Sequence, residues 1–405
     1  MTNRQAATGI IKQLQDEDFT ALLAGGCVRD MLLGRQAKDY DVATNALPED
    51  VVRLFKRTLK VGAKFGVVIV LIEGQQVEVA TFRTEDGYAD GRHPSKVRFA
   101  DPAEDASRRD FTINGMFYDP LEKKVIDYVE GQTDLEKKLV RTIGQPAQRF
   151  GEDYLRMLRA VRFATQLRFA IEDKTWSAIC DTAKNITRIS GERIAMELEG
   201  ILTDPNRSLG AELLIECGLA EAIFPEFAGK EAEMAVDILD RLPKKTDFAL
   251  GLVGLFAAFP TRFAVERCKV LKLSRNQNKH IKFLLDNRDR LLDEQMSLAE
   301  LKMILAEPCF DDLYELQKAI QKAGGKSIAA LVNLRKKIKA LGDVELKPKP
   351  LLDGHSLMKL GAVPGPAFGQ LARELYIAQL EGAVQTPKQA EQWTLKWLQK
   401  HGNKR

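Results

Sequence analysis

The apolar pattern of this chain changes near Gly144, and that change restricts the folds open to it. Before this point, short β-branched runs are separated by turn residues. The runs 67–72 and 77–82, joined across Glu73-Gly74-Gln75, predict a β-hairpin. Helical patterns over 8–15, 28–33 and 48–56 fall in the same region. Helices and strands mixed in this order predict a small α+β head with a mixed sheet.

After Gly144 the strand signal disappears. Apolar residues then recur at helical spacing in most segments, among them 152–167, 172–185, 191–202 and 208–217. Proline and glycine break the later segments near 204, 259, 324 and 348. The C-terminal two-thirds of the chain is therefore predicted to be all-α.

Length and composition limit the class of protein. The 405 residues, 45% of them apolar, can form several packed units with a sizeable core. No apolar run is long enough to cross a membrane, and Met1–Gln15 has no signal-peptide pattern. A net charge of +4 neither requires nor excludes RNA. Widely spaced cysteines argue against zinc and favour reduced thiols in the cytoplasm; they are Cys27, Cys180, Cys217, Cys268 and Cys309.

The first candidate functional group contains two aspartates. In an extended strand, Asp39 and Asp41 would present both carboxylates on one face, where they repel unless a cation lies between them. Mg²⁺ suits such a pair because it prefers oxygen ligands. The preceding Gly25 and Gly26 allow backbone N–H groups to approach a phosphate at a helix start, and Arg29 could neutralise it. A tight turn and a solvated acidic pair are the alternative for either feature alone.

Glu78 is a third acidic candidate. It lies between Val77 and Val79, so strand alternation places it on the face opposite these valines. There it could join Asp39 and Asp41 in a metal site for in-line nucleotidyl transfer. A surface glutamate on a half-buried strand explains the same pattern equally well.

Two arginines and an aspartate begin the segment 108–115. Arg108 and Arg109 offer forked donors for phosphate or ribose oxygens, and Asp110 can accept from ribose hydroxyls. Alternation is expected to direct Asp110, Thr112 and Asn114 toward a cleft, and Phe111 and Ile113 toward the core. The start of an ordinary amphipathic helix has the same spacing, so spacing alone does not choose between the two interpretations.

The last group lies at the start of the segment 152–167. Asp153 and Arg156 are three residues apart and predicted to share a helix face, where an ordinary ion pair is one interpretation. Base selection is the other. Cytosine and adenine each place an acceptor ring nitrogen beside a donor amino group, so an arginine N–H and a carboxylate would hold either base. Uracil and guanine would leave groups unpaired, so such a pair could select C and A without a nucleic-acid template.

These four groups, in this order between Leu22 and about Leu202, resemble the motifs of bacterial (class II) CCA tRNA nucleotidyltransferases and of their relatives, the bacterial poly(A) polymerases. The resemblance implies a role for each group. It assigns metal binding to Asp39 and Asp41; triphosphate contacts to Gly25, Gly26 and Arg29; ribose recognition to Arg109 and Asp110; base pairing to Asp153 and Arg156; and phosphate contacts to Arg159 and Arg162. Glu78 is our addition to the catalytic carboxylates.

Three further segments favour CCA addition over poly(A) synthesis. Residues 61–67 have the glycine-containing form of CCA-adding enzymes, and residues 360–369 resemble the tail of that group. Residues 82–94 resemble a flexible loop that is expected to help switch the pocket from CTP to ATP. Enzymes that make poly(A) or add only A can keep the same catalytic groups, so they are alternatives. A catalytically inactive RNA-binding relative is a more remote one.

The resemblance also implies a nucleotidyltransferase head followed by a helical neck, body and tail. We expect the head over 1–144, a neck with base recognition over 145–203, a body over 204–330 and an RNA-binding tail over 331–405. The expected ligands are tRNA, CTP, ATP and Mg²⁺. The oligomeric state is not given by the sequence.

Overall fold

The computed structural model describes residues 1–62, 66–88, 94–340 and 345–401. The chain divides into two compact units. The first comprises Met1–Val236, Lys244–Phe248 and Glu266–Leu273, and the second comprises Asp237–Pro243, Ala249–Val265 and Ser274–Arg405. Parts of two predicted segments, 63–65 in the glycine-containing stretch and 89–93 in the loop, lie outside the described residues.

A mixed sheet of seven strands forms the centre of the head, in the order β3-β4-β5-β2-β1-β8-β9. β2 pairs in parallel with β5, and the other neighbouring strands are antiparallel. The strands are β1 (Ala21–Ala24), β2 (Asp41–Thr44), β3 (Thr58–Gly62), β4 (Val67–Ile72), β5 (Gln75–Thr81), β8 (Phe117–Asp119) and β9 (Lys124–Ile126). The predicted α+β head with a mixed sheet is confirmed.

The predicted hairpin is formed by β4 and β5, with Ile72 paired to Gln75. Its two-residue turn places Glu73 at φ 45° and Gly74 at φ 80°. Two positive φ angles match the twist of a tight hairpin, and glycine takes such a conformation without strain. β5 ends one residue before the predicted end, because Phe82 turns into the core and is fully buried there.

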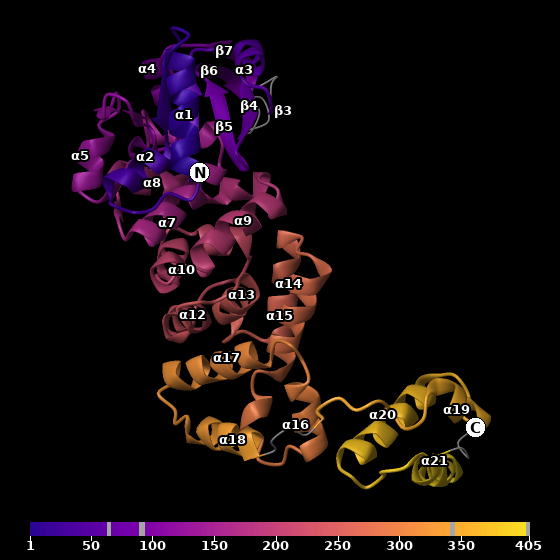
Figure 1. Cartoon of the computed structure of the whole chain (residues 1–405). Coiled ribbons are helices and arrows are strands. Elements are labelled where there is room, and N and C mark those ends of the chain that lie inside the picture. Colours follow the sequence, from indigo (N-terminus) through magenta and orange to yellow (C-terminus); the bar gives the residue numbers. More distant parts are fainter. Residues whose placement is uncertain (63–65, 89–93, 341–344, 402–405) are drawn as a thin grey trace. The chain divides into compact units, whose positions relative to one another are not determined.

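Helix α1 (Asn3–Gln15) covers one face of this sheet (Figure 1). It buries Ala6, Ile10 and Leu14. The helix begins five residues before the predicted start because Thr2 caps it: the Thr2 hydroxyl accepts from Gln5 N, and the Gln5 side chain accepts from Thr2 N.

The remaining elements of the first unit are mainly helices. They are α2 (Gly26–Leu32), α3 (Pro48–Leu54), α4 (Pro102–Ser107), η2 (Thr112–Asn114), α5 (Gly131–Glu136), α6 (Pro146–Glu152), α7 (Leu155–Leu167), α8 (Asp173–Thr182), η3 (Ala183–Arg188), α9 (Gly191–Leu202), α10 (Arg207–Glu216), α11 (Leu219–Ile223) and η4 (Lys269–Leu271). β6 (Arg83–Tyr88) and β7 (Pro94–Phe99) form an antiparallel ribbon. β10 (Leu139–Val140) pairs with β11 (Ala170–Ile171), so one short strand does follow Gly144.

The second unit is helical in its described residues. α12 (Lys230–Arg241), α13 (Phe248–Phe256) and α14 (Thr261–Cys268) contribute to both units. The others are α15 (Arg275–Asn287), η5 (Arg290–Leu292), α16 (Leu298–Leu305), α17 (Phe310–Ala323), α18 (Ala329–Ala340), α19 (Gly354–Lys359), α20 (Pro366–Leu380) and α21 (Pro387–His401). The all-α prediction for this region is confirmed.

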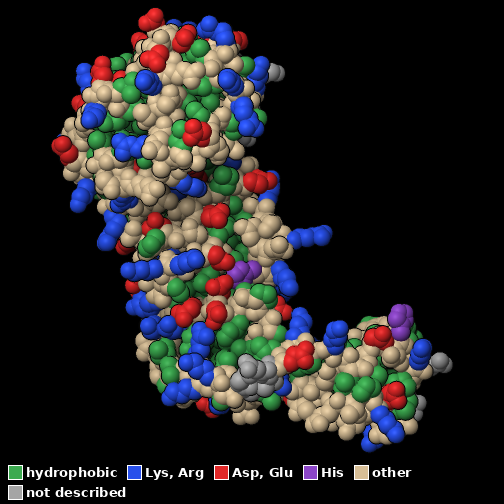
Figure 2. Space-filling model, viewed as in Figure 1, with side chains coloured by type: hydrophobic (Ala, Val, Ile, Leu, Met, Phe, Trp, Pro, Cys, Tyr) green, Lys and Arg blue, Asp and Glu red, His purple; other side chains and the backbone are tan. Residues whose placement is uncertain are grey.

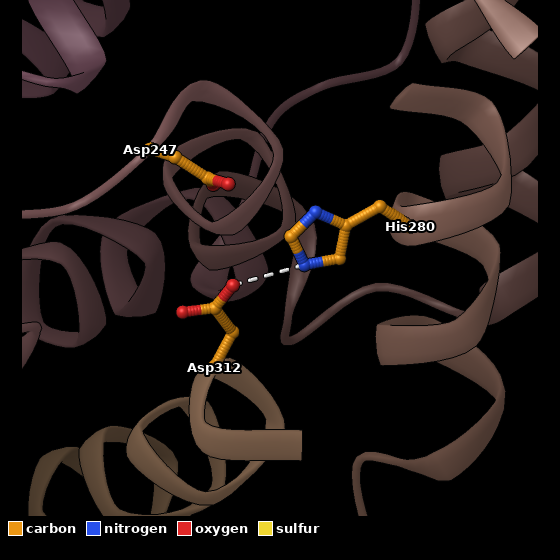
Figure 3. Close-up of side chains that lie close together, drawn as sticks. All are labelled: Asp247, His280 and Asp312. Atoms are coloured by element: carbon orange, nitrogen blue, oxygen red, sulfur yellow. Dashed lines mark ion pairs between the residues drawn. The ribbon is translucent and has the colours of Figure 1, made fainter. Parts of the chain in front are cut away.

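Two features characterise the contacts between helices in the second unit. The last three helices share an apolar core that includes Leu357, Leu371 and Trp397. Between α15 and α17, His280 Nε2 lies 3.0 Å from Asp312 Oδ2 (Figure 3).

Across the described residues of both units, we find no helix with the length and apolar character needed to cross a membrane.

Candidate active site

A cavity of about 690 Å³ in the first unit gathers most of the residues singled out in the sequence. It is lined by Gly25, Gly26, Arg29, Asp39, Asp41, Arg109, Asp110, Asp153, Arg156, Arg159 and Arg162, together with Arg108, Asn114, Leu155, Phe163 and Arg193. Its size is in the range of small-molecule sites. Seven arginines face four aspartates in this lining, and the excess of positive charge suits a polyanion such as a triphosphate.

Two of the candidate carboxylates come from the start of β2 and the residues just before it. Asp41 is the first residue of β2, whereas Asp39 precedes the strand, so the predicted extended strand contains only one of the pair. Both nevertheless line the cavity. Because Val42 pairs with Val79 in parallel register, Glu78 comes beside Asp41 on the next strand. Val79 is buried and Glu78 is exposed, so the predicted alternation of β5 is confirmed.

A second cavity of about 250 Å³ adjoins this group. It contains Asp41 and Glu78 above a floor of small side chains from three strands, Ala24, Ala43 and Ala80. Glu78 is therefore separated from the larger cavity, which it does not line, but it shares the smaller one with Asp41.

The charge on Asp41 is poorly compensated by the protein. Desolvation, together with the negative charges of Glu78 and Asp39, raises the pKa of Asp41 to about 6, and Arg109 opposes this only in part. Among the described residues, neither Asp41, Asp39 nor Glu78 forms an ion pair. Clustered carboxylate oxygens without a protein cation fit a hard divalent ion.

The backbone at Gly25 is shaped by its neighbours. Gly25 has φ 75° and precedes α2, which starts at Gly26 rather than at the predicted Val28. A Cβ at Gly25 would lie 2.9 Å from Arg109 Nη1, so a side chain there would displace this arginine. One turn into the helix, Arg29 Nη1 donates to Asn114 Oδ1 at 2.6 Å, and the guanidinium lies 5.1 Å from the Phe163 ring.

Asp110 is held by several donors at the cavity wall. Its Oδ1 accepts from Phe111 N and Asn114 Nδ2, and its Oδ2 accepts from Arg159 Nε at 2.8 Å. Burial acts to raise the pKa of Asp110, but the Arg159 charge and these hydrogen bonds lower it to about 2. The prediction for Thr112 is wrong: its hydroxyl donates to the buried Asp134 at 2.5 Å, because η2 turns this side chain away from the cavity.

Asp153 and Arg156 both reach the cavity, but they do not share a helix face. Asp153 is extended, with φ −151°, between α6 and α7, so the predicted helix 152–167 starts at Leu155. Arg193 of α9 donates to Asp153 Oδ2 at 2.6 Å, while Arg156 Nη1 donates to Glu152 Oε2 at 2.5 Å. The ordinary ion pair between Asp153 and Arg156 is therefore not formed. Each side chain is instead fixed separately at the wall of the cavity.

Arg159 and Arg162 project from the next turns of α7. Arg162 Nε donates to Glu197 Oε2 at 2.6 Å, and Arg159 Nη1 lies 3.8 Å from Glu197 Oε1. Both guanidinium groups also lie over the Phe163 ring, at 4.3 and 5.4 Å. Glu197 of α9 thus orders the two arginines while leaving them in the cavity lining.

Arg193, Glu197 and Glu152 are absent from the residues proposed from sequence, whereas Asn114, which was expected to face a cleft, does line the cavity. Arg193 and Glu197 are four apart on α9, so they share a face, and this spacing was a usable signal. Their partners are about 35–40 residues away in sequence. The spacing shows that the two residues share a face of α9 but not that this face meets the polar side of α7, which is why these residues were missed.

Comparison with known proteins identifies the family of this chain. The pattern of the family described as "Poly A polymerase head domain" matches residues 21–141, and that of "Probable RNA and SrmB-binding site of polymerase A" matches residues 168–230. The chain is 33% identical to the CCA-adding enzyme of Lactobacillus johnsonii over 394 residues, which is 94% of each chain. It is 43% identical to the CCA-adding enzyme of Geobacillus stearothermophilus over 240 residues, or 59% of each.

Among solved structures, the crystal structure of Bacillus stearothermophilus CCA-adding enzyme in complex with CTP superimposes with a TM-score of 0.79. It covers 99% of both chains at 28% identity. The mixed-sheet head and the matching head pattern define the class as nucleotidyltransferase. Within that class, the chain belongs to the family of CCA-adding enzymes. Nucleotidyltransferases of this family use a divalent metal ion.

Proposed function

We propose that this chain adds CCA to the 3′ end of tRNA, using CTP and ATP and releasing pyrophosphate. The observation that carries the proposal is that a single cavity joins Asp39 and Asp41, which form no ion pair with any described residue, to Asp153 and Arg156. RNA binding alone needs no unpaired carboxylates facing a polyanion, which disfavours an inactive relative. The relatives are named CCA-adding enzymes, which favours CCA addition over poly(A) or A-only synthesis.

Mg²⁺ is the proposed cofactor, with Asp39 and Asp41 as its ligands and Glu78 beside them. The donor set fits because these carboxylates offer hard oxygen atoms and have no cationic partner among the described residues. When bound, the ion would neutralise part of the triphosphate charge and favour ionisation of the attacking 3′-hydroxyl.

The other proposed contacts assign one part of the nucleotide to each group in the cavity lining. The backbone at Gly25 and Gly26, with Arg29, faces the triphosphate; Arg109 and Asp110 face the ribose; Arg159 and Arg162 face phosphate oxygens. The 3′-hydroxyl oxygen of the RNA bonds to the α-phosphorus, the bond to pyrophosphate breaks, and the hydroxyl proton is released.

Base selection is assigned to Asp153 and Arg156. Arg193 holds Asp153, and Glu152 holds Arg156, so the acceptor and the donor have fixed positions before a base arrives. Such preorganisation increases discrimination because a wrong base would leave buried groups unpaired.

Incorporation of labelled nucleotides tests the proposed function. Purified protein is given tRNA lacking its CCA end, with each of the four NTPs alone and with CTP and ATP together. We expect CTP alone to add two residues and the mixture to add one further A. Long A tracts without C would assign poly(A) synthesis, A added only to a CC end would assign A-only addition, and no incorporation would assign an inactive relative.

Substitution of Arg156 tests the selection of bases. Arg156→Ala removes the donor to the ring nitrogen, so we expect the preference for CTP and ATP over UTP and GTP to fall by at least about tenfold. The ratio of kcat/KM values for the four NTPs measures this. Lys282→Ala is the control, since Lys282 pairs with Asp286 on the surface of the second unit. A uniform loss of rate with the preference intact would contradict the assignment.

Two further proposals concern the whole chain. We propose the division into a head (1–144), a neck (145–203), a body (204–330) and a tail (331–405), with base recognition in the neck and RNA binding in the tail. We also propose a cytoplasmic location, supported by the tRNA substrate and by five cysteines that are all free thiols.

A further inference from the structure

A buried carboxylate, Asp105 of α4, lies behind the arginines of the site without lining either cavity. Its side chain is 2% exposed. Oδ1 accepts from Arg108, at 2.7 Å from Nη2 and 3.0 Å from Nε. Oδ2 accepts from Arg109, at 2.9 Å from Nη2 and 3.1 Å from Nε. Each oxygen therefore fixes one guanidinium group by two of its donors.

The same carboxylate reaches the base of the β6–β7 ribbon. Asp105 Oδ1 also accepts from the backbone N–H of Arg83, the first residue of β6, at 3.2 Å. Arg108 Nε donates to the carbonyl oxygen of Arg83 at 2.8 Å. Asp105 thus connects the start of the ribbon to both arginines.

The position of Arg109 matters because it lies near Asp41, which must be available to the proposed metal ion. Arg109 lines both cavities, as does Asp41, and its charge acts on Asp41. An arginine released from its partner would be attracted to Asp41 and Glu78, where it would compete with a divalent ion. Asp105 occupies the Nε–Nη2 edge of Arg109, so that Nη1 is the nitrogen beside Gly25 and Asn114.

Burial of an unpaired aspartate charge costs free energy, so a buried aspartate needs hydrogen bonds or cationic partners. Burial acts to raise the pKa of Asp105, but Arg109 and Arg108 together hold this pKa below its usual value. The Phe117 ring, 5.1 Å from the Arg109 guanidinium carbon, supports the arginine from another side. The arrangement is specific to a charged carboxylate, because an amide at this position would turn N–H donors toward one arginine.

We propose that Asp105 is a positioning residue for nucleotide transfer: it holds Arg109 toward the nucleotide and away from Asp41. The same carboxylate connects Arg109 to Arg108 and to the start of β6. This inference rests on the proposed function. Asp105 touches no substrate and acts through Arg109.

Asp105→Asn is the direct test. We expect KM for both CTP and ATP to rise about tenfold, which is the lower end of the loss seen when outer-shell partners of metal ligands are removed. The Mg²⁺ concentration for half-maximal rate should rise as well, with a smaller change in kcat. Asp101→Asn is the matched control: Asp101 caps the same helix by accepting from Glu104 N at 2.8 Å, so it tests general damage to α4.

A double-mutant cycle with Arg109→Ala separates positioning from stability. If Asp105 acts through Arg109, Asp105→Asn raises KM in the wild type but adds little once Arg109 is removed. A purely structural role would multiply the two effects. Unfolding midpoints are recorded for every variant. If Asp105→Asn does not fold, Asp105→Glu, which keeps the charge but moves the carboxylate, is placed in the same cycle.

The outcomes distinguish this inference from the proposed function. A wild-type enzyme that adds neither C nor A would reject the proposed function itself. An active wild type in which Asp105→Asn behaves like Asp101→Asn, or a cycle with multiplicative effects, would overturn the role of Asp105 alone.

Discussion

At the scale of single residues, the proposed chemistry depends on the charge of Asp41. Desolvation, Glu78 and Asp39 all favour the protonated carboxyl, and the pKa of Asp41 rises from 3.8 to about 6. The metal-free protein is therefore destabilised by ionising Asp41 as pH rises through this window, and a bound cation reverses the penalty. The repulsion among these carboxylates is the physical basis for the metal affinity that we propose.

The pH dependence of Mg²⁺ binding follows from this charge. We expect the apparent Mg²⁺ affinity, measured by titration calorimetry without nucleotide, to rise steeply from about pH 5 to pH 6 and to level off above pH 7, because a proton competes with the ion for Asp41. Asp41→Asn should remove both the Mg²⁺ binding and the transfer activity while tRNA binding is retained.

The stability of the metal-free protein gives an independent reading of the same group. The free energy of unfolding of Asp41→Asn, compared with that of the wild type, should show the larger difference above pH 6 and a smaller one near pH 4. Equal Mg²⁺ affinity at pH 5 and pH 7, or a stability difference independent of pH, would contradict the assignment of Asp41.

At the scale of elements, α9 orders the polar side of α7. Arg193 holds Asp153, and Glu197 holds Arg162. The N-terminus of α9 packs closely on η4: a Cβ at Gly191 would lie 1.8 Å from the carbonyl oxygen of Val270. Backbone atoms cannot yield as a flexible side chain does, so the position of this helix depends on the glycine.

Gly191→Ala tests this dependence. Overpacking against the Val270 backbone should lower the free energy of unfolding by about 1–3 kcal/mol and shift Arg193 and Glu197. We therefore expect a lower thermal midpoint and a raised KM for CTP. Gly9→Ala in α1 is the matched control, because a Cβ there meets no atom within 4 Å and alanine favours a helix. A Gly191→Ala protein as stable and active as Gly9→Ala would show that α9 is not held by this contact.

At the scale of the whole molecule, basic residues are spread over both units and interspersed with acidic ones, as the visible face in Figure 2 shows. α18 is an exception in composition: Lys336, Lys337 and Lys339 are exposed on it, and no acidic residue occurs in the helix. Arg335 of the same helix pairs with Asp311. Exposed lysines without acidic neighbours on their own helix suit contacts with RNA phosphates.

Replacing these three lysines by glutamine should weaken tRNA binding. If each contacts one phosphate, the slope of log K against log[salt] should fall in magnitude by about 2–3, because counterion release scales with the number of contacts. Filter binding across a salt series measures this slope, and KM for CTP should be unchanged. The control exchanges three exposed lysines of the head, Lys123, Lys124 and Lys137, for glutamine. An unchanged slope in the α18 variant would assign the RNA contacts elsewhere.

The sequence predicted the head, the hairpin and the helical remainder because apolar periodicity and turn residues are local properties. It also predicted the residues that line the cavity, since the chemistry of residue types such as the Asp39–Asp41 pair can be inferred before the fold is known. The structure places these residues together in the first unit, and the roles assigned to them are the subject of the experiments above.

Most of the long-range partners were decided by the tertiary structure. The sequence placed Asp153 and Arg156 on one helix face, but the break between α6 and α7 gives them to Arg193 and Glu152. Thr112 was directed to the cavity by alternation, but a short η2 turn buries it on Asp134. Asp105 precedes Arg108 and Arg109 by three and four residues, which is a helical spacing, but its burial and its contact with Arg83 of β6 depend on packing. Spacing along the chain determines which groups are available, whereas long-range packing determines which of them meet, because an ion pair depends on distance in space and not in sequence.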